Sequence, residues 1–160
     1  MNMISILQSG LALLAALVML TWPGHSFALV TSNVLTRLFM IKNGNDTGSA
    51  FTIERDGRQY LVTARHVVPN IKDDDSIELL KEGRWSSYTV KRITVDPPNA
   101  DIAVLALPSP LPGTLPVTTD GAMTLSEELY FLGFPYGLVI PGVVQESGFH
   151  LPLVKRGIVS

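Results

Sequence analysis

The chain has 160 residues, of which 46% are hydrophobic and 16% charged, and its formal net charge is −2. This composition excludes an intrinsically disordered chain, and 12 basic against 14 acidic residues give no sign of the basic face of a nucleic-acid binder. No cysteine is present, which excludes disulfides, thiolate metal sites and a cysteine nucleophile. The length suits one domain with one or two modest cores.

The first 28 residues contain no Asp, Glu, Lys or Arg. An apolar run from Gly10 to Leu20 has the length of a signal-peptide core, and a Pro-Gly helix breaker and a small-x-small pattern ending at Ala28 follow it. We expect residues 1–28 to be a signal peptide, leaving a periplasmic or secreted protein that is free of the membrane. A retained membrane anchor is the alternative, because the start of the leader lacks Lys and Arg.

After the leader, short β-type runs alternate with turn residues, and no segment shows helical periodicity over ten or more residues. Asp56-Gly57 predicts a tight hairpin, since both turn positions of such a loop favour positive φ. Further turns are expected at 43–46 and 96–99. The run Ile102–Leu107 is apolar throughout, which is typical of a buried strand. The expected strands are Val34–Ile41, Ser49–Arg55, Arg58–Thr63, Ile77–Lys81, Tyr88–Val95 and Ile102–Leu107.

A proline-rich segment at 108–116 holds four prolines and a glycine in nine residues, so it is interpreted as an inter-lobe linker. The chain then divides into a first lobe at 29–107 and a partial second lobe at 117–160. Many short strands separated by turn signals predict an all-β barrel or sandwich. The strands expected in the second lobe are Leu129–Gly133, Val143–Phe149 and Val154–Val159.

Two residues that could act together in catalysis are His66, directly after a predicted strand, and Asp101, at the start of another. A histidine can act as a general base near neutral pH because the unperturbed pKa of its imidazole is about 6.5. A buried carboxylate beside the ring fixes its tautomer and stabilises the imidazolium that forms. The alternatives are a structural histidine and an aspartate that caps the preceding turn.

Five short motifs follow one another along the chain: Gly48–Ile53, Thr63–His66, Asp101–Leu105, Leu132–Gly137 and Gly157–Ser160. In sequence and in order they resemble motifs of the trypsin-like peptidases, and most closely those of the bacterial HtrA-like branch. The resemblance implies an all-β, chymotrypsin-like double β-barrel with a complete six-stranded first barrel and a truncated second barrel. It also implies serine endopeptidase activity on a polypeptide substrate, with His66 as the general base and Asp101 as its orienting carboxylate.

The sequence departs from the family pattern at its nucleophile. No Gly-x-Ser-Gly-Gly occurs in residues 1–160, and Gln145–Gly148 lacks the preceding glycine and comes too early in the family order. We therefore expect a partial protease chain whose serine would follow Ser160 and which is inactive by itself. A non-catalytic, protease-like β-barrel that binds other proteins is the alternative. Smaller departures are Arg65, Val67 and Phe134, where the family usually has other residues.

No cofactor or metal is expected. His25, His66 and His150 are too dispersed for a zinc site, and Asp73–Asp75 with Glu78 lack the spacing of a calcium loop and are interpreted as solvated. Neither nucleic acid nor, after cleavage of the leader, a membrane is an expected partner. The sequence gives no indication of the oligomeric state or of substrate specificity.

Overall fold

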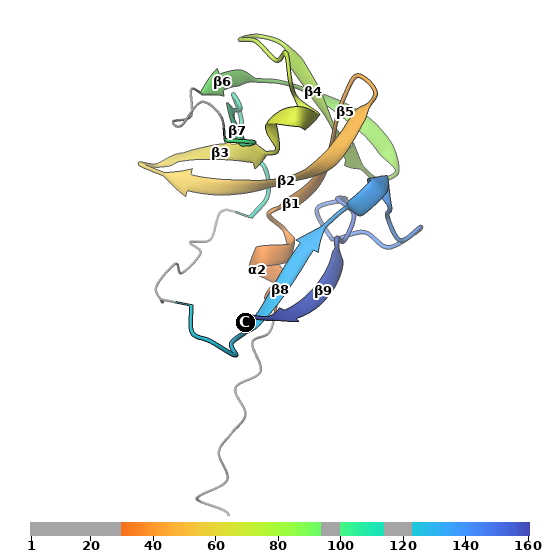
Figure 1. Ribbon diagram of the computed structural model, residues 1–160. Helices are drawn as coiled ribbons and strands as arrows, with labels where there is room; N and C mark the ends of the chain where they lie inside the picture. The colour runs from red at the N-terminus through yellow and green to blue at the C-terminus, as the bar shows by residue number, and fades with distance from the viewer. Residues whose placement is uncertain (1–29, 94–99, 114–122) are drawn as a thin grey trace, which may run out of the picture.

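The computed structural model describes residues 30–93, 100–113 and 123–160. The expected signal peptide, the 96–99 turn and the end of the 108–116 linker lie outside these residues. Within them nearly all regular structure is β-strand, so the predicted all-β class is confirmed (Figure 1). No helix among the described residues is both long and apolar enough to cross a membrane.

Seven strands form one sheet in the order β5-β4-β1-β2-β3-β7-β6. The edge strands β5 and β6 are consecutive in the chain and are separated only by Val90, so the sheet curls until its edges meet (Figure 1). The Val90 N–H donates to the Asp75 carbonyl at 2.9 Å, which extends the β4–β5 pairing by one residue beyond Thr89. Because β5 and β6 are one run interrupted only at Val90, the seven strands correspond to the expected six-stranded barrel. The strands are β1 Leu38–Asn43, β2 Asp46–Arg55, β3 Arg58–Thr63, β4 Ser76–Lys81, β5 Arg84–Thr89, β6 Lys91–Ile93 and β7 Ala103–Ala106.

Tight turns between these strands use residues with positive φ. The predicted Asp56-Gly57 turn joins β2 to β3, with φ values of 52° and 71°. A second turn of this kind, Glu82-Gly83, joins β4 to β5 with φ values of 51° and 72°. It was not predicted, because Glu is not a usual residue for this position and the polar start of β5 shows no apolar alternation. The strand expected to begin at Tyr88 therefore begins earlier.

The strand predicted at Val34–Ile41 is wrong at its start. Residues Ser32–Leu35 form a single helical turn, α2, whose N-cap Thr31 accepts the Val34 N–H at its hydroxyl oxygen, 3.4 Å away. Threonine at this position stabilises a helix start by satisfying an otherwise unpaired amide. The strand β1 begins only at Leu38.

The strand predicted at 143–149 is also wrong. Gly142 and Gly148 have φ values of 75° and 81° and turn the chain at both ends of this segment. Of the expected pairing two isolated bridges remain, one between Val144 and His150 and one between Phe149 and Lys81. The turn instead carries the side chain of Phe149 into the barrel.

Several side chains from outside the strands help to complete the barrel core, and two of them, Leu111 and Phe149, come from later in the chain than the last barrel strand. Leu111, from the linker, is 5% exposed, and Phe149 is 1% exposed. The Phe149 ring meets Phe39 edge to face, with centroids 4.7 Å apart and an interplanar angle of 86°, which is a favoured aromatic geometry. The strands contribute fully buried residues that include Phe39, Ile41, Ala50, Leu61, Ile77, Leu79 and Leu105.

The second part of the chain contains two antiparallel strands, β8 (Glu128–Gly133) and β9 (Leu153–Ile158), and the short turn η2 (Pro135–Gly137). It meets the barrel through Phe134, which is 2% exposed and packs in a second apolar cluster. The barrel side of this cluster consists of Leu38, Met40 and Leu80.

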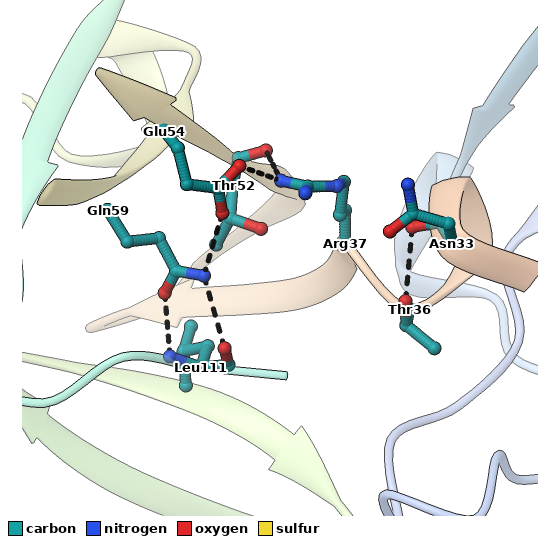
Figure 2. A network of polar contacts seen from close by, with 7 residues as sticks. All are labelled: Asn33, Thr36, Arg37, Thr52, Glu54, Gln59 and Leu111. Carbon is teal, nitrogen blue, oxygen red and sulfur yellow. Dashed lines mark hydrogen bonds and ion pairs between the residues drawn. The ribbon is translucent and has the colours of Figure 1, made fainter. Parts of the chain in front are cut away.

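A polar network ties the linker to the barrel (Figure 2). The Gln59 amide accepts the Leu111 N–H at 2.6 Å and donates to the Leu111 carbonyl at 3.1 Å, so both backbone groups of this linker residue are paired. Gln59 also donates to Glu54, which forms an ion pair with the buried Arg37. Arg37 in turn donates to the Thr52 carbonyl at 3.3 Å. The linker is therefore fixed at Leu111 rather than free along its length.

Candidate active site

The turn that follows β3 positions His66. β3 ends at Thr63, and residues Arg65–Val67 form the short 3-10 turn η1, in which Val67 is buried. Gly48 on β2 lies against this turn, and a Cβ there would come within 2.7 Å of a Val67 methyl group. The absence of a side chain at Gly48 thus allows the His66 turn to pack closely on the sheet.

Asp101 reaches the same end of the sheet by strand pairing. β3 and β7 are antiparallel with Thr63 opposite Ala103, so the residues just after Thr63 and just before Ala103 are neighbours. The Asp101 carboxylate lies 2.7 Å from Nδ1 of His66 and also accepts the His66 backbone N–H at 3.0 Å. The structure therefore brings together the two residues singled out in the sequence.

The electrostatics follow from these two contacts. The hydrogen bond to the His66 ring, followed by the His66 backbone N–H, holds the pKa of the Asp101 carboxyl below its usual value of 3.8. With the carboxylate at Nδ1, that nitrogen carries the proton of the neutral ring, and Nε2 is the basic nitrogen. The carboxylate thus fixes the orientation of the His66 ring.

Both side chains of the pair are largely exposed. The side chains of His66 and Asp101 are 73% and 59% exposed. Both residues lie on the rim of the barrel, and the β8–β9 hairpin packs on the barrel through Phe134 rather than over them. Solvent screens the electrostatic interaction between the two side chains in this position.

Ser49 connects the His66 strand to the second part of the chain. Its carbonyl accepts the Thr63 hydroxyl at 2.9 Å, and its own hydroxyl oxygen accepts the Phe134 N–H at 2.8 Å. A Cβ at Gly133 would lie 2.7 Å from the same oxygen, so only glycine fits there without a shift. Sequence reasoning identified both motifs but not this contact, because the two residues are 85 positions apart.

The other candidate residues lie elsewhere. Asp75 and Asp73 accept backbone N–H groups of Lys72 and Arg92 at 2.8 Å and 3.1 Å. His150 is 6% exposed in the turn beside Val144. In the part of the chain that the structure describes, no three His, Cys, Asp or Glu side chains gather as a metal site would require.

Comparison with known protein families shows to which family the chain belongs. The family model for the trypsin-like peptidase domain matches residues 48–160, which is well over half of the chain. The protein therefore belongs to the trypsin-like peptidase domain family, as its motifs predicted. No sequence among curated proteins matches the chain.

Solved structures agree on the fold. Deg5 superposes with a TM-score of 0.51 at 22% identity, over 80% of this chain and 59% of Deg5, so the chain spans about three fifths of that protein. The Rv3671c protease in its inactive form gives 0.48 at 18% identity, over 79% and 68% of the two chains. The MamO protease domain of Magnetospirillum magneticum gives 0.44 at 15% identity, over 79% and 61%. The family match and the Deg5 superposition together confirm the chymotrypsin-like fold with a complete first barrel and a partial second barrel.

Proposed function

We propose that this chain is the base-carrying part of a serine endopeptidase that hydrolyses peptide bonds in polypeptides. The contact that supports the proposal most directly is the 2.7 Å approach of the Asp101 carboxylate to Nδ1 of His66. A surface histidine or a turn-capping aspartate would not need this pairing across 35 residues. The membership of the trypsin-like peptidase domain family supports the same role.

In the proposed reaction, Nε2 of His66 removes the hydroxyl proton of a serine as the serine oxygen attacks the scissile carbonyl carbon. Asp101 stabilises the imidazolium that results. The imidazolium then gives its proton to the departing amine, the C–N bond breaks, and an acyl-enzyme ester remains. Water, deprotonated by the same imidazole, hydrolyses the ester and restores the serine.

The nucleophile is proposed to come from sequence that follows residue 160, because Gly-x-Ser-Gly-Gly does not occur within 1–160. That motif supplies both the serine and the backbone amides of the oxyanion hole in this family. Residues 1–160 alone are then inactive, since loss of the nucleophile lowers turnover by about a millionfold.

A fluorophosphonate probe and a casein assay test the proposal on two proteins, residues 1–160 and a longer form of the chain that includes the serine motif. We expect labelling and hydrolysis only with the longer form. Asp101→Asn should lower its turnover by about 10⁴-fold, because the ring loses its correct tautomer. Asp56→Asn, in an exposed turn, is the matched control and should leave turnover unchanged. Labelling of Ser147 or Ser160 in the short form would contradict the assignment.

A non-catalytic binding module is the second candidate. It agrees with the absence of Gly-x-Ser-Gly-Gly from residues 1–160. Detection in cells of a stable protein that ends without a serine motif would select this candidate over the protease.

Export is proposed on the leader sequence alone. The charge-free residues 1–28 and the small-x-small pattern ending at Ala28 support cleavage at this point. N-terminal sequencing of exported protein should begin at Leu29. Recovery of protein with an intact Met1 from the membrane fraction would instead support the retained anchor.

A further inference from the structure

The outer surface of the barrel is polar on one side and apolar on the other. On β1, β4 and β5 the side chains of Lys42, Glu78 and Ser87 lie in register, and Lys42 pairs with Glu78 at 3.4 Å. On β2, β3, β7 and β6 the residues in register are instead Phe51, Val62, Val104 and Ile93.

This second row points away from the barrel core. On β2 the neighbours of Phe51, Ala50 and Thr52, are 0% and 2% exposed, whereas Phe51 itself is 45% exposed. The adjacent row places Ile53, which is 39% exposed, opposite Tyr60, and Tyr60 opposite Ala106. We call these outward residues the outer apolar face: Phe51, Ile53, Tyr60, Val62, Ile93, Val104 and Ala106.

An antiparallel sheet with one face in water normally alternates apolar and polar residues. The strand β7 does not, because Ala103 and Leu105 point inward while Val104 and Ala106 point outward. Elsewhere on the same barrel, apolar residues that face out of it, such as Met40 and Leu80, pack in one cluster with Phe134 and are 6% and 8% exposed. Because Phe134 covers Met40 and Leu80, we expect another polypeptide segment to cover the outer apolar face in the same way.

A surface hollow beside the outer apolar face indicates the charge that a bound segment should carry. The hollow has a volume of about 390 Å³, and its lining combines Tyr60, Ile93 and Ala106 with the basic side chains of Arg58 and Lys91. Among the residues that the structure describes, that lining includes no carboxylate. A neighbouring hollow of about 270 Å³ contains one, Asp74, so among these described residues the excess positive charge lies on the Arg58 side.

We propose that the outer apolar face binds an extended segment of another polypeptide that carries alternating apolar side chains and a carboxylate at one end. The apolar side chains pack on Phe51, Val62 and Val104, and the carboxylate meets Arg58 and Lys91. Each central strand of this face already has two neighbours, so recognition occurs through side chains rather than through addition of a strand. This site goes beyond the proposed hydrolysis and does not require the His66–Asp101 pair.

The test uses the full 160-residue chain and two fluorescein-labelled ten-residue peptides. Both alternate Val and Leu with Ser, and one ends in two Glu while the other ends in two Gln. Fluorescence anisotropy should show binding of the Glu peptide that weakens with added salt, and about tenfold weaker binding of the Gln peptide. Equal affinities for the two peptides, or no binding of either, would overturn the proposal.

Variants locate the site. Arg58→Glu and Lys91→Glu should each weaken binding of the Glu peptide about tenfold, whereas Arg84→Glu, the same charge change on the exposed start of β5, should leave the affinity unchanged. Val104→Thr keeps the shape of the side chain and should weaken both peptides, with a thermal melt confirming that the variant is folded.

Two further results would contradict the proposal that an extended peptide binds the outer apolar face. Sedimentation could show that copies of the chain associate through the face, with Phe51→Glu returning them to monomers. Amide exchange could show peptide protection outside the strands of the face, residues 51–62, 91–93 and 103–106, which would place the binding elsewhere. Protection confined to those residues in a monomer would support the proposal.

Discussion

The barrel and the β8–β9 hairpin are both antiparallel β-structure, yet they differ in what they can bury. Every long strand of the barrel except β5 places at least one residue completely out of solvent, because the sheet closes around its own apolar side. No residue of β8 or β9 is buried, and Phe131, Val154 and Ile158 are 60%, 50% and 65% exposed. A two-stranded hairpin has no second layer to enclose its side chains.

The comparison teaches that the hairpin depends on the barrel for its stability. Its attachment uses the buried ring of Phe134 and the hydrogen bond from the Phe134 N–H to Ser49. The turn that follows η2 contributes to the barrel in return, through Phe149. The following variants separate these contributions, beginning with the one of largest expected effect.

Phe149→Ala should lower the free energy of unfolding by about 3–5 kcal/mol, because it leaves a cavity next to Phe39 in the barrel core. Phe131→Ala, at a 60% exposed position of the hairpin, should change it by less than about 0.5 kcal/mol. Urea unfolding of the two variants measures the difference. Similar values would mean that the barrel does not depend on Phe149 for its core.

Gly48→Ala should lower the free energy of unfolding by about 1–3 kcal/mol, because the added methyl group meets a buried Val67 methyl at 2.7 Å. Gly157→Ala on the hairpin is the matched control, since its new methyl meets only the outer edge of the exposed Phe131 ring, at 3.0 Å. The double variant with Val67→Ala should recover part of the loss. No recovery in urea unfolding would contradict the steric explanation.

Ser49→Ala should lower the free energy of unfolding by about 1 kcal/mol, because the part-buried Phe134 N–H loses its acceptor. Hydrogen exchange should accelerate at the Phe134 amide more than at amides of β3. Ser87→Ala, on the polar outer row, is the control and should alter neither quantity. Unchanged exchange at Phe134 would show that the hairpin is attached by packing alone.

The smallest effect is expected from pH. The pKa of Asp101 lies below its usual value of 3.8 in the folded chain, mainly through the hydrogen bond to the His66 ring. The carboxylate therefore contributes stability above the unfolded pKa, and this contribution is lost as the pH falls through the folded value. Carboxyl NMR titration should find the low pKa in the wild type and a higher one in His66→Ala. Equal values would contradict the contact.

Local signals explain which parts of the fold were predictable. The Asp56-Gly57 hairpin followed from two residues whose φ preference is strong, whereas Glu82-Gly83 was missed because Glu gives no such signal. The side chains that complete the core could not be found locally. Phe39 and Phe149 are 110 positions apart, and no periodicity links a turn residue to a distant strand.

The candidate site was predictable only in part. Its residues were identified by their resemblance to family motifs and not by physical arguments alone. Motif resemblance identified His66 and Asp101, and the β3–β7 register supplies the physical reason for their proximity. Their exposure was not predictable, because it depends on which other segments pack around the rim. The role of Ser49 depends likewise on a contact with Phe134, 85 residues later.

The position of Phe149 has a consequence for biosynthesis. The last barrel strand ends at Ala106, and the ring that completes the core is added 43 residues later. At about 5–20 residues per second, a ribosome takes roughly 2–9 s to add those residues. During that interval the nascent barrel has all its strands but an unfilled core, so the interval is a window in which a chaperone can bind the emerging chain.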